Sequence, residues 1–128
     1  MKMPISEVVD RYTITLIRKK KTDFDVEEEL AAYRKEIEKY NGVLDEYIDR
    51  LSYYNEVVWD AEARASRDMN LNQHTEEDYI RIGKVSVDIR EANKLRNGVK
   101  ADIVEATKEG FKETPINYKK VDYGKNDL

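Results

Sequence analysis

Three side chains that could bind an anion recur at helical spacing in the last third of the chain. Asn93, Arg96 and Lys100 are three and four residues apart, so on an α-helix they share one face and point hydrogen-bond donors the same way. Arg96 also lies in a line of apolar residues that recur at steps of three and four, at a position where an apolar residue is expected. Because burial of an unpaired charge costs several kcal/mol, Arg96 requires a carboxylate or a ligand as partner.

Two hypotheses for Arg96 remain open at the level of sequence. The first is an internal salt bridge to Asp10, Asp45, Asp49 or Glu62. The second is a small anionic ligand such as a nucleotide, with Arg96 and Lys100 on phosphate and a tyrosine stacked on a base. The candidate ligand-binding residues are Asp10, Lys19, Tyr47, Tyr54, Glu62, Asn93, Arg96 and Lys100.

Patterns for catalysis or metal binding are weaker. Asp45 and Glu46 each form a helical-spacing carboxylate pair with Asp49, which raises a third hypothesis, a Mg²⁺-dependent nucleotide hydrolase. No second carboxylate motif of matching spacing occurs on the facing seam. His74 is the only histidine, and the chain contains no cysteine. We therefore predict no catalytic residue, no metal site and no cofactor.

The elements that position these residues follow from a heptad repeat in the first half of the chain. Apolar residues recur there at steps of four and three, which predicts a helix lying along other helices. Asn41-Gly42 would ordinarily indicate a turn, but the repeat passes through it unbroken. The pattern thus predicts one central helix of roughly 44 residues, about 65 Å long at 1.5 Å per residue. The seam is Val26, Leu30, Tyr33, Ile37, Tyr40, Leu44, Tyr47, Leu51, Tyr54, Val58, Ala61 and Ala65.

Two shorter helices flank the central one. The first is expected from about Ser6, as N-cap, to residue 21, and the last from a cap at Thr75 and Asp78 to about residue 109, with Gly110 ending it. The fold class is therefore all-α, a three-helix antiparallel bundle built on a long helical hairpin. Residues 1–110 are expected to form a single helical domain and residues 111–128 an extended tail.

Composition limits the partners. The 128 residues are 40% hydrophobic and 39% charged with a net charge of −4, which argues against duplex nucleic acid as a partner. No apolar run approaches the length that spans a membrane, so a cytoplasmic protein is expected. A second apolar line on the central helix, with Ile48 and Trp59 as its members, has no obvious partner within one chain. This line predicts a homo-oligomer.

Three stretches together resemble an uncharacterised family of small helical proteins from bacteria and phages. The family opens close to V-G-E-x-I-D-K-L-T-I-L-x-I-K, where this chain has ISEVVDRYTITLIRK. The family elements N-x-x-x-W-x-x-E and N-x-x-R-x-x-x-K are matched by NEVVWDAE and by Asn93, Arg96 and Lys100. The resemblance implies candidate positions and no reaction. They are Asp10, Arg11, Thr13, Lys19, Trp59, Glu62, Asn93, Arg96 and Lys100.

The sequence thus supports two classes of function besides the hydrolase. The first is a non-enzymatic helical protein that binds or sequesters a nucleotide-like anion; the analogous size and helicity of phage proteins that sequester host nucleotides suggests an anti-defence role. The second is a helical protein–protein interaction module, for example an inhibitor of a host factor, acting through its acidic face or its tail.

Overall fold

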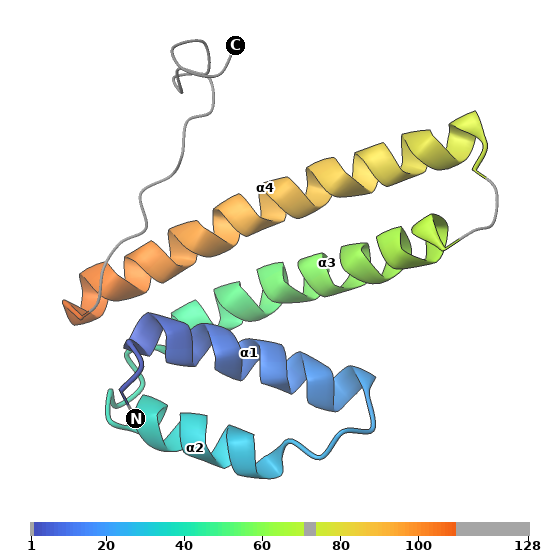
Figure 1. The fold of residues 1–128 in the computed structure, drawn as a ribbon. Helices are drawn as coiled ribbons and strands as arrows, with labels where there is room; N and C mark the ends of the chain where they lie inside the picture. Colours follow the sequence, from blue (N-terminus) through green and yellow to red (C-terminus); the bar gives the residue numbers. More distant parts are fainter. Residues whose placement is uncertain (1, 71–73, 110–128) are drawn as a thin grey trace, which may run out of the picture.

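A computed structural model describes residues 2–70 and 74–109, and the all-α prediction is confirmed there. The four helices are α1 (Ile5–Lys21), α2 (Glu27–Glu38), α3 (Asp45–Met69) and α4 (Glu76–Thr107). No strand occurs within these residues. Successive helices run in opposite directions, so that α3 and α4 form a long hairpin with α1 and α2 to one side (Figure 1). The expected tail lies outside the described residues.

The prediction of one unbroken central helix is wrong. The chain turns over residues 39–44, between α2 and α3, because Asn41 (φ 52°) and Gly42 (φ 85°) adopt left-handed backbone conformations. Glycine takes this conformation without a steric penalty and asparagine tolerates it better than most residues. The described part of the chain therefore contains four helices, and α2 folds back along α1 instead of continuing into α3.

The heptad repeat survives this turn because both sides of it pack into the same core. Tyr33 of α2 and Leu51 of α3 belong to one cluster of buried residues, and Leu44 in the turn itself is completely buried. Ile37 packs against that cluster before the turn, Tyr40 does so within it and Tyr47 after it. The unbroken heptad repeat therefore indicates that the two helices share one core, and not that they form one continuous helix.

α1 packs on the side of α3 for which the sequence predicts a second copy of the chain as partner. Ile48, from the second apolar line, packs against the core cluster, and the neighbouring Asn55 is buried by contact with α1. Ile48 thus has a partner within the chain, and the homo-oligomer stays a prediction. α1 begins at Ile5 after Pro4, and Ser6 is buried inside the helix, so its assignment as N-cap is wrong.

The capping prediction for α4 is confirmed. Thr75 Oγ1 accepts a hydrogen bond from the Asp78 backbone N–H at 3.2 Å, and an Asp78 carboxylate oxygen accepts one from the Thr75 N–H at 2.8 Å. This reciprocal pair is a capping box. At the other end α4 closes on Lys108, which is left-handed (φ 57°), two residues before the predicted Gly110. Gly110 itself lies outside the described residues.

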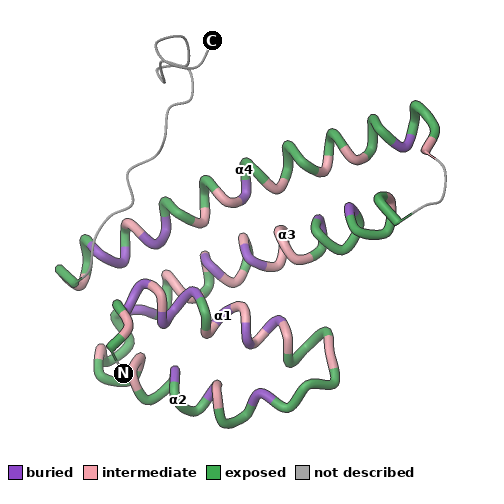
Figure 2. Tube along the Cα trace, in the orientation of Figure 1, coloured by how far each residue is buried: buried purple, intermediate pink, exposed green. Residues whose placement is uncertain are grey.

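The molecule has two regions of different packing. We call the part where α1 and α2 cover the hairpin the closed end; its core includes Val8, Val9, Leu51, Val99 and Ile103. We call residues 61–70 and 74–90 the hairpin arm; it begins after Asp60 of α3, which pairs with Lys21, the last residue of α1. Figure 2 shows most of the buried residues at the closed end and mainly exposed or intermediate ones along the arm. None of the described helices is both long and apolar enough to cross a membrane.

Candidate functional site

The Arg96 guanidinium forms an ion pair with Asp10 across the bundle. Arg96 Nη2 donates to Asp10 Oδ2 at 2.7 Å and Nε donates to Oδ1 at 3.0 Å, a two-bond contact between α4 and α1. Asp10 is 2% exposed, whereas the Arg96 side chain is 25% exposed. The salt-bridge hypothesis is therefore confirmed, with Asp10 as the partner among the four carboxylates considered.

Two further polar side chains complete this network from α3 and α1. Asn55 Nδ2 donates to Asp10 Oδ1 at 2.9 Å and to Thr13 Oγ1 at 2.8 Å. The Thr13 hydroxyl in turn donates to the Asp10 carbonyl oxygen at 2.7 Å. Both side chains are buried, where an unmet hydrogen bond costs about 1–3 kcal/mol. The network thus ties three helices together at their crossing point.

The environment keeps Asp10 ionised. Burial by itself would raise the pKa of Asp10, but hydrogen bonds from Arg96 and Asn55, together with the positive charges of Arg96 and Lys100, hold the pKa below its ordinary value. A carboxylate with a lowered pKa is a poor proton acceptor near neutral pH. In this structure the Asp10 carboxylate is therefore the anionic half of an ion pair with Arg96.

Lys100 and Asn93 lie beside Arg96 as their spacing predicts. Lys100 Nζ lies 2.5 Å from Glu7 Oε1 of α1, and the lysine is only 9% exposed. Asn93 Oδ1 accepts a hydrogen bond from Arg96 Nη1 at 3.2 Å. The three residues do share one face of α4, and that face contacts α1 through carboxylates.

The other candidate residues lie apart from this network. Lys19 Nζ is paired with Glu27 Oε1 at 2.6 Å, nine residues further along α1 than Asp10. Tyr47 and Tyr54 pack against the core cluster of the closed end, and the Arg50 guanidinium lies 5.9 Å from the Tyr47 ring centroid. Glu62 belongs to the hairpin arm. The structure therefore brings together Asp10, Asn93, Arg96 and Lys100, and not the full set of eight.

Sequence reasoning missed the role of Asn55 and Glu7. A signal for Asn55 was available, since it lies between Ile48 and Trp59 on the second apolar line and a buried amide needs polar partners. Thr13, drawn from the family resemblance, lies in the same network. Glu7 lies in the first turn of α1 and pairs with Lys100. No buried polar side-chain atom in the described part of the chain lacks a hydrogen-bond partner.

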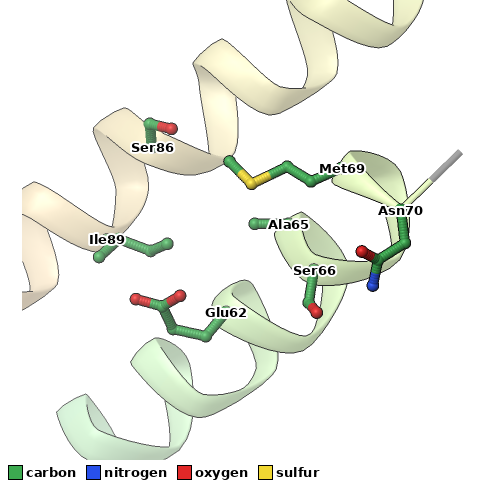
Figure 3. Close-up of a pocket in the computed structure, with 7 residues that line it drawn as sticks. All are labelled: Glu62, Ala65, Ser66, Met69, Asn70, Ser86 and Ile89. Atoms are coloured by element: carbon green, nitrogen blue, oxygen red, sulfur yellow. The ribbon is translucent and has the colours of Figure 1, made fainter. Parts of the chain in front are cut away.

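A groove lies between α3 and α4 on one side of the hairpin arm. We call it groove A; it has a volume of about 520 Å³. Figure 3 shows Glu62 and Ile89 reaching into the space between the two helices, with Met69 extending towards α4. Its lining residues are Glu62, Ala65, Ser66, Met69, Asn70, Ser86 and Ile89. Met69 is 56% exposed although it is apolar, so the groove is open to solvent.

The opposite side of the arm carries a second groove of about 400 Å³, which we call groove B. Arginine and lysine dominate its lining, although Arg81 is committed to Asp78 and lies 3.6 Å from Asp68. The lining residues are Arg64, Arg67, Asp68, Arg81, Lys84, Val85 and Asp88. Both grooves are on the arm and neither touches the Asp10–Arg96 network.

The carboxylates behind the hydrolase hypothesis lie at the start of α3. Asp45, Glu46 and Asp49 are all exposed, and Glu46 Oε1 is 4.0 Å from Arg50 Nη1. Within residues 2–70 and 74–109, no group of three or more potential ligands is arranged to hold a metal ion.

Comparison with known proteins adds no assignment. No protein-family model, curated protein or solved structure matches the chain. The resemblance to a bacterial and phage family therefore stays a prediction. What the fold and the geometry define is the class: an all-helical protein with a polar network at its crossing point and an exposed two-helix arm.

Proposed function

We propose that the protein is a non-enzymatic helical module that holds a helix of a partner protein in groove A. The observation that carries this proposal is that groove A continues the surface of α3 and α4 that α1 contacts. Asn55, which contacts α1, is followed on the same face of α3 by Glu62, Ser66 and Met69 of the groove, at helical spacing. On α4, Arg96 contacts α1 and Ile89 lies seven residues earlier. Groove A thus extends the surface on which the chain's own helix already packs.

The lining chemistry suits an amphipathic helix. Ala65, Ser66 and Ser86 are small, which lets a partner backbone approach closely, and Met69 is a flexible apolar side chain that adapts to different surfaces. Glu62 supplies a single carboxylate. The expected occupant therefore has an apolar face with one lysine or arginine placed against Glu62.

A photo-crosslinking amino acid placed inside and outside the groove tests this function. With the crosslinker at Ser66, irradiation of cells that produce the protein should give one discrete adduct. The control position is Ala63, which is exposed on α3 and does not line either groove. Adducts that are the same from both positions, or no adduct from Ser66, would contradict the proposal.

A variant that fills the groove gives an independent check. Ser86→Trp places an indole over groove A, so the adduct formed from Ser66 should disappear while the circular dichroism spectrum stays helical. Ala63→Trp adds the same side chain outside the groove and should leave the adduct unchanged. Retention of the adduct in folded Ser86→Trp would remove groove A from consideration.

The anionic-ligand hypothesis is the second candidate, because Arg96 and Lys100 share one face at the crossing of α1 and α4. A nucleotide bound there would have to displace the Asp10 and Glu7 carboxylates. A ligand at a hundredfold excess over its dissociation constant stabilises a protein by about 2.7 kcal/mol, which a thermal-shift screen of mono-, di- and cyclic nucleotides detects. If no nucleotide raises the melting temperature, this hypothesis fails, and with it the anti-defence role of a phage protein.

A further inference from the structure

α4 carries an apolar stripe that no other part of the described chain covers. Ile80, Val87 and Leu95 are 51%, 60% and 51% exposed. Lys84 and Glu91 lie between them, so the five residues follow one another at steps of four, three, four and four and occupy one face of the helix. We call this face the α4 stripe.

The stripe points away from both neighbours of α4. The side of α4 that packs against α3 is formed by the seam that runs through Val99 and Ile103, and the side that contacts α1 carries Arg96 and Lys100. On a helix of 3.6 residues per turn the stripe is about a third of a turn from the α3 seam, on the side opposite α1. It is also separate from the seven residues that line groove A.

The residue types in and beside the stripe are unfavourable for an isolated solvent-facing helix. Ile80 and Val87 are β-branched, and Gly83 and Gly98 interrupt the helix interior. A Cβ atom built on either glycine meets nothing within 4 Å, so packing within the chain does not explain these glycines. Small residues on an open helix face permit close approach by another helix.

We propose that the α4 stripe binds the same stripe of a second copy, with the two α4 helices antiparallel. The charges support this occupant, because the stripe is complementary to itself in that orientation. When Lys84 faces Glu91 of the second copy, Glu91 faces the second copy's Lys84, and the same register sets Ile80 against the second copy's Leu95. Val87 then lies within one residue of the two-fold axis. A parallel arrangement would instead place like charges opposite each other.

The predicted interface is small. From Ile80 to Leu95 the stripe extends roughly 22 Å at 1.5 Å per residue. A helix pair of this length buries an area at the lower end of the range for specific complexes. The dimer should therefore dissociate when the protein is diluted. Lys84 and Glu91 are exposed and form no ion pair among the residues that the structure describes, so both are available to the second copy.

Charge-reversal variants test the register by sedimentation equilibrium. Wild-type protein should show a monomer–dimer equilibrium. Lys84→Glu and Glu91→Lys should each raise the dimer dissociation constant by about tenfold or more, since symmetry repeats each like-charge contact twice. The double variant Lys84→Glu/Glu91→Lys restores both pairs and should recover wild-type association. Lys35→Glu, on the exposed surface of α2, is the matched control and should dimerise normally.

Mixing the two single variants is the sharpest discriminator. Each alone places like charges across the two-fold axis, but a heterodimer of Lys84→Glu with Glu91→Lys regains both opposite-charge pairs. We therefore expect the mixture to associate at concentrations where each variant alone is monomeric. All variants are expected to keep wild-type helical content, because residues 84 and 91 are exposed.

A single cysteine at the axis gives a covalent readout. The chain has no cysteine, so Val87→Cys should form an intermolecular disulfide under mild oxidation, while Ala63→Cys, away from the stripe, should not. The proposal is overturned if the wild type stays monomeric throughout, if the folded double variant fails to associate, or if the mixed variants form no heterodimer.

Discussion

The closed end and the hairpin arm use the same two helices in different ways. At the closed end, α1 lies against α3 and α4, so that Leu51, Val99 and Ile103 are fully buried. In the described part of the arm the buried apolar residues are the small Ala61 and Ala65, whereas Met69, Tyr79, Ile80 and Val87 are exposed. The difference shows that apolar burial is concentrated where a third helix covers the hairpin.

Polar residues follow the same division. In the closed end Asp10 and Asn55 are buried and fully hydrogen-bonded across three helices, whereas the arginines of the arm lie around an open groove. Buried polar networks need every member in place, while exposed charges contribute little to stability. Substitutions in the two regions should therefore differ strongly in their effect on folding.

The largest expected contrast comes from removal of apolar side chains. Leu51 is 0% exposed in the closed end, so Leu51→Ala should lower the free energy of unfolding by about 2–5 kcal/mol. Met69→Ala, at a half-exposed site in the arm, should cost less than about 1 kcal/mol. Urea denaturation monitored by circular dichroism measures both. Equal losses at the two sites would show that the arm is as tightly packed as the closed end.

The second prediction concerns the buried ion pair. Asp10→Asn should lower the free energy of unfolding by about 2–3 kcal/mol at neutral pH. This is less than the roughly 3–5 kcal/mol typical of a broken buried ion pair, because water reaches part of the Arg96 side chain. Charge removal in the arm by Asp88→Asn should have an effect within about 0.5 kcal/mol.

The cost of Asp10→Asn should depend on pH with a defined sign. Since folding lowers the pKa of Asp10, its stabilising contribution is present above its unfolded pKa of about 3.9 and is lost as pH falls through the folded value. The difference between wild type and Asp10→Asn should therefore be constant near neutral pH and shrink below about pH 4. A difference that grows on acidification would contradict this assignment.

Glycine substitutions should have opposite signs in the two regions. Gly42 has φ 85° in the turn of the closed end, so Gly42→Ala should destabilise by about 1–2 kcal/mol through backbone strain. The nearest atom to its added Cβ is 3.6 Å away, so no clash adds to this cost. Gly83→Ala, in open space on the arm, should stabilise by up to about 1 kcal/mol. Melting temperatures of the two variants test the comparison.

The last comparison concerns the tip of the arm. Thr75→Ala removes one half of the capping box and should cost about 1 kcal/mol. Because local unfolding of the arm does not disturb the core, hydrogen exchange should accelerate for amides near the start of α4 and not for those around Val99. Uniform acceleration in both regions would mean that the arm and the closed end unfold together.

Several features follow from the sequence alone. Apolar residues at steps of three and four determine the helices, and Thr75 with Asp78 determines the start of α4, because both depend on neighbours within one or two turns. The position of Arg96 in an apolar seam also predicted a buried partner of opposite charge. Each of these is a local pattern whose energetic reason is independent of the rest of the fold.

Other features were decided only by tertiary packing. Asn41 and Gly42 are compatible with either a helix or a turn, and the turn is formed because it lets Tyr33 and Leu51 enter the same core. Likewise, the sequence offered four carboxylates for Arg96, and the crossing of α1 with α4 selected Asp10. Periodicity states that a residue is buried but not which neighbour buries it, since that depends on contacts between segments far apart in the chain.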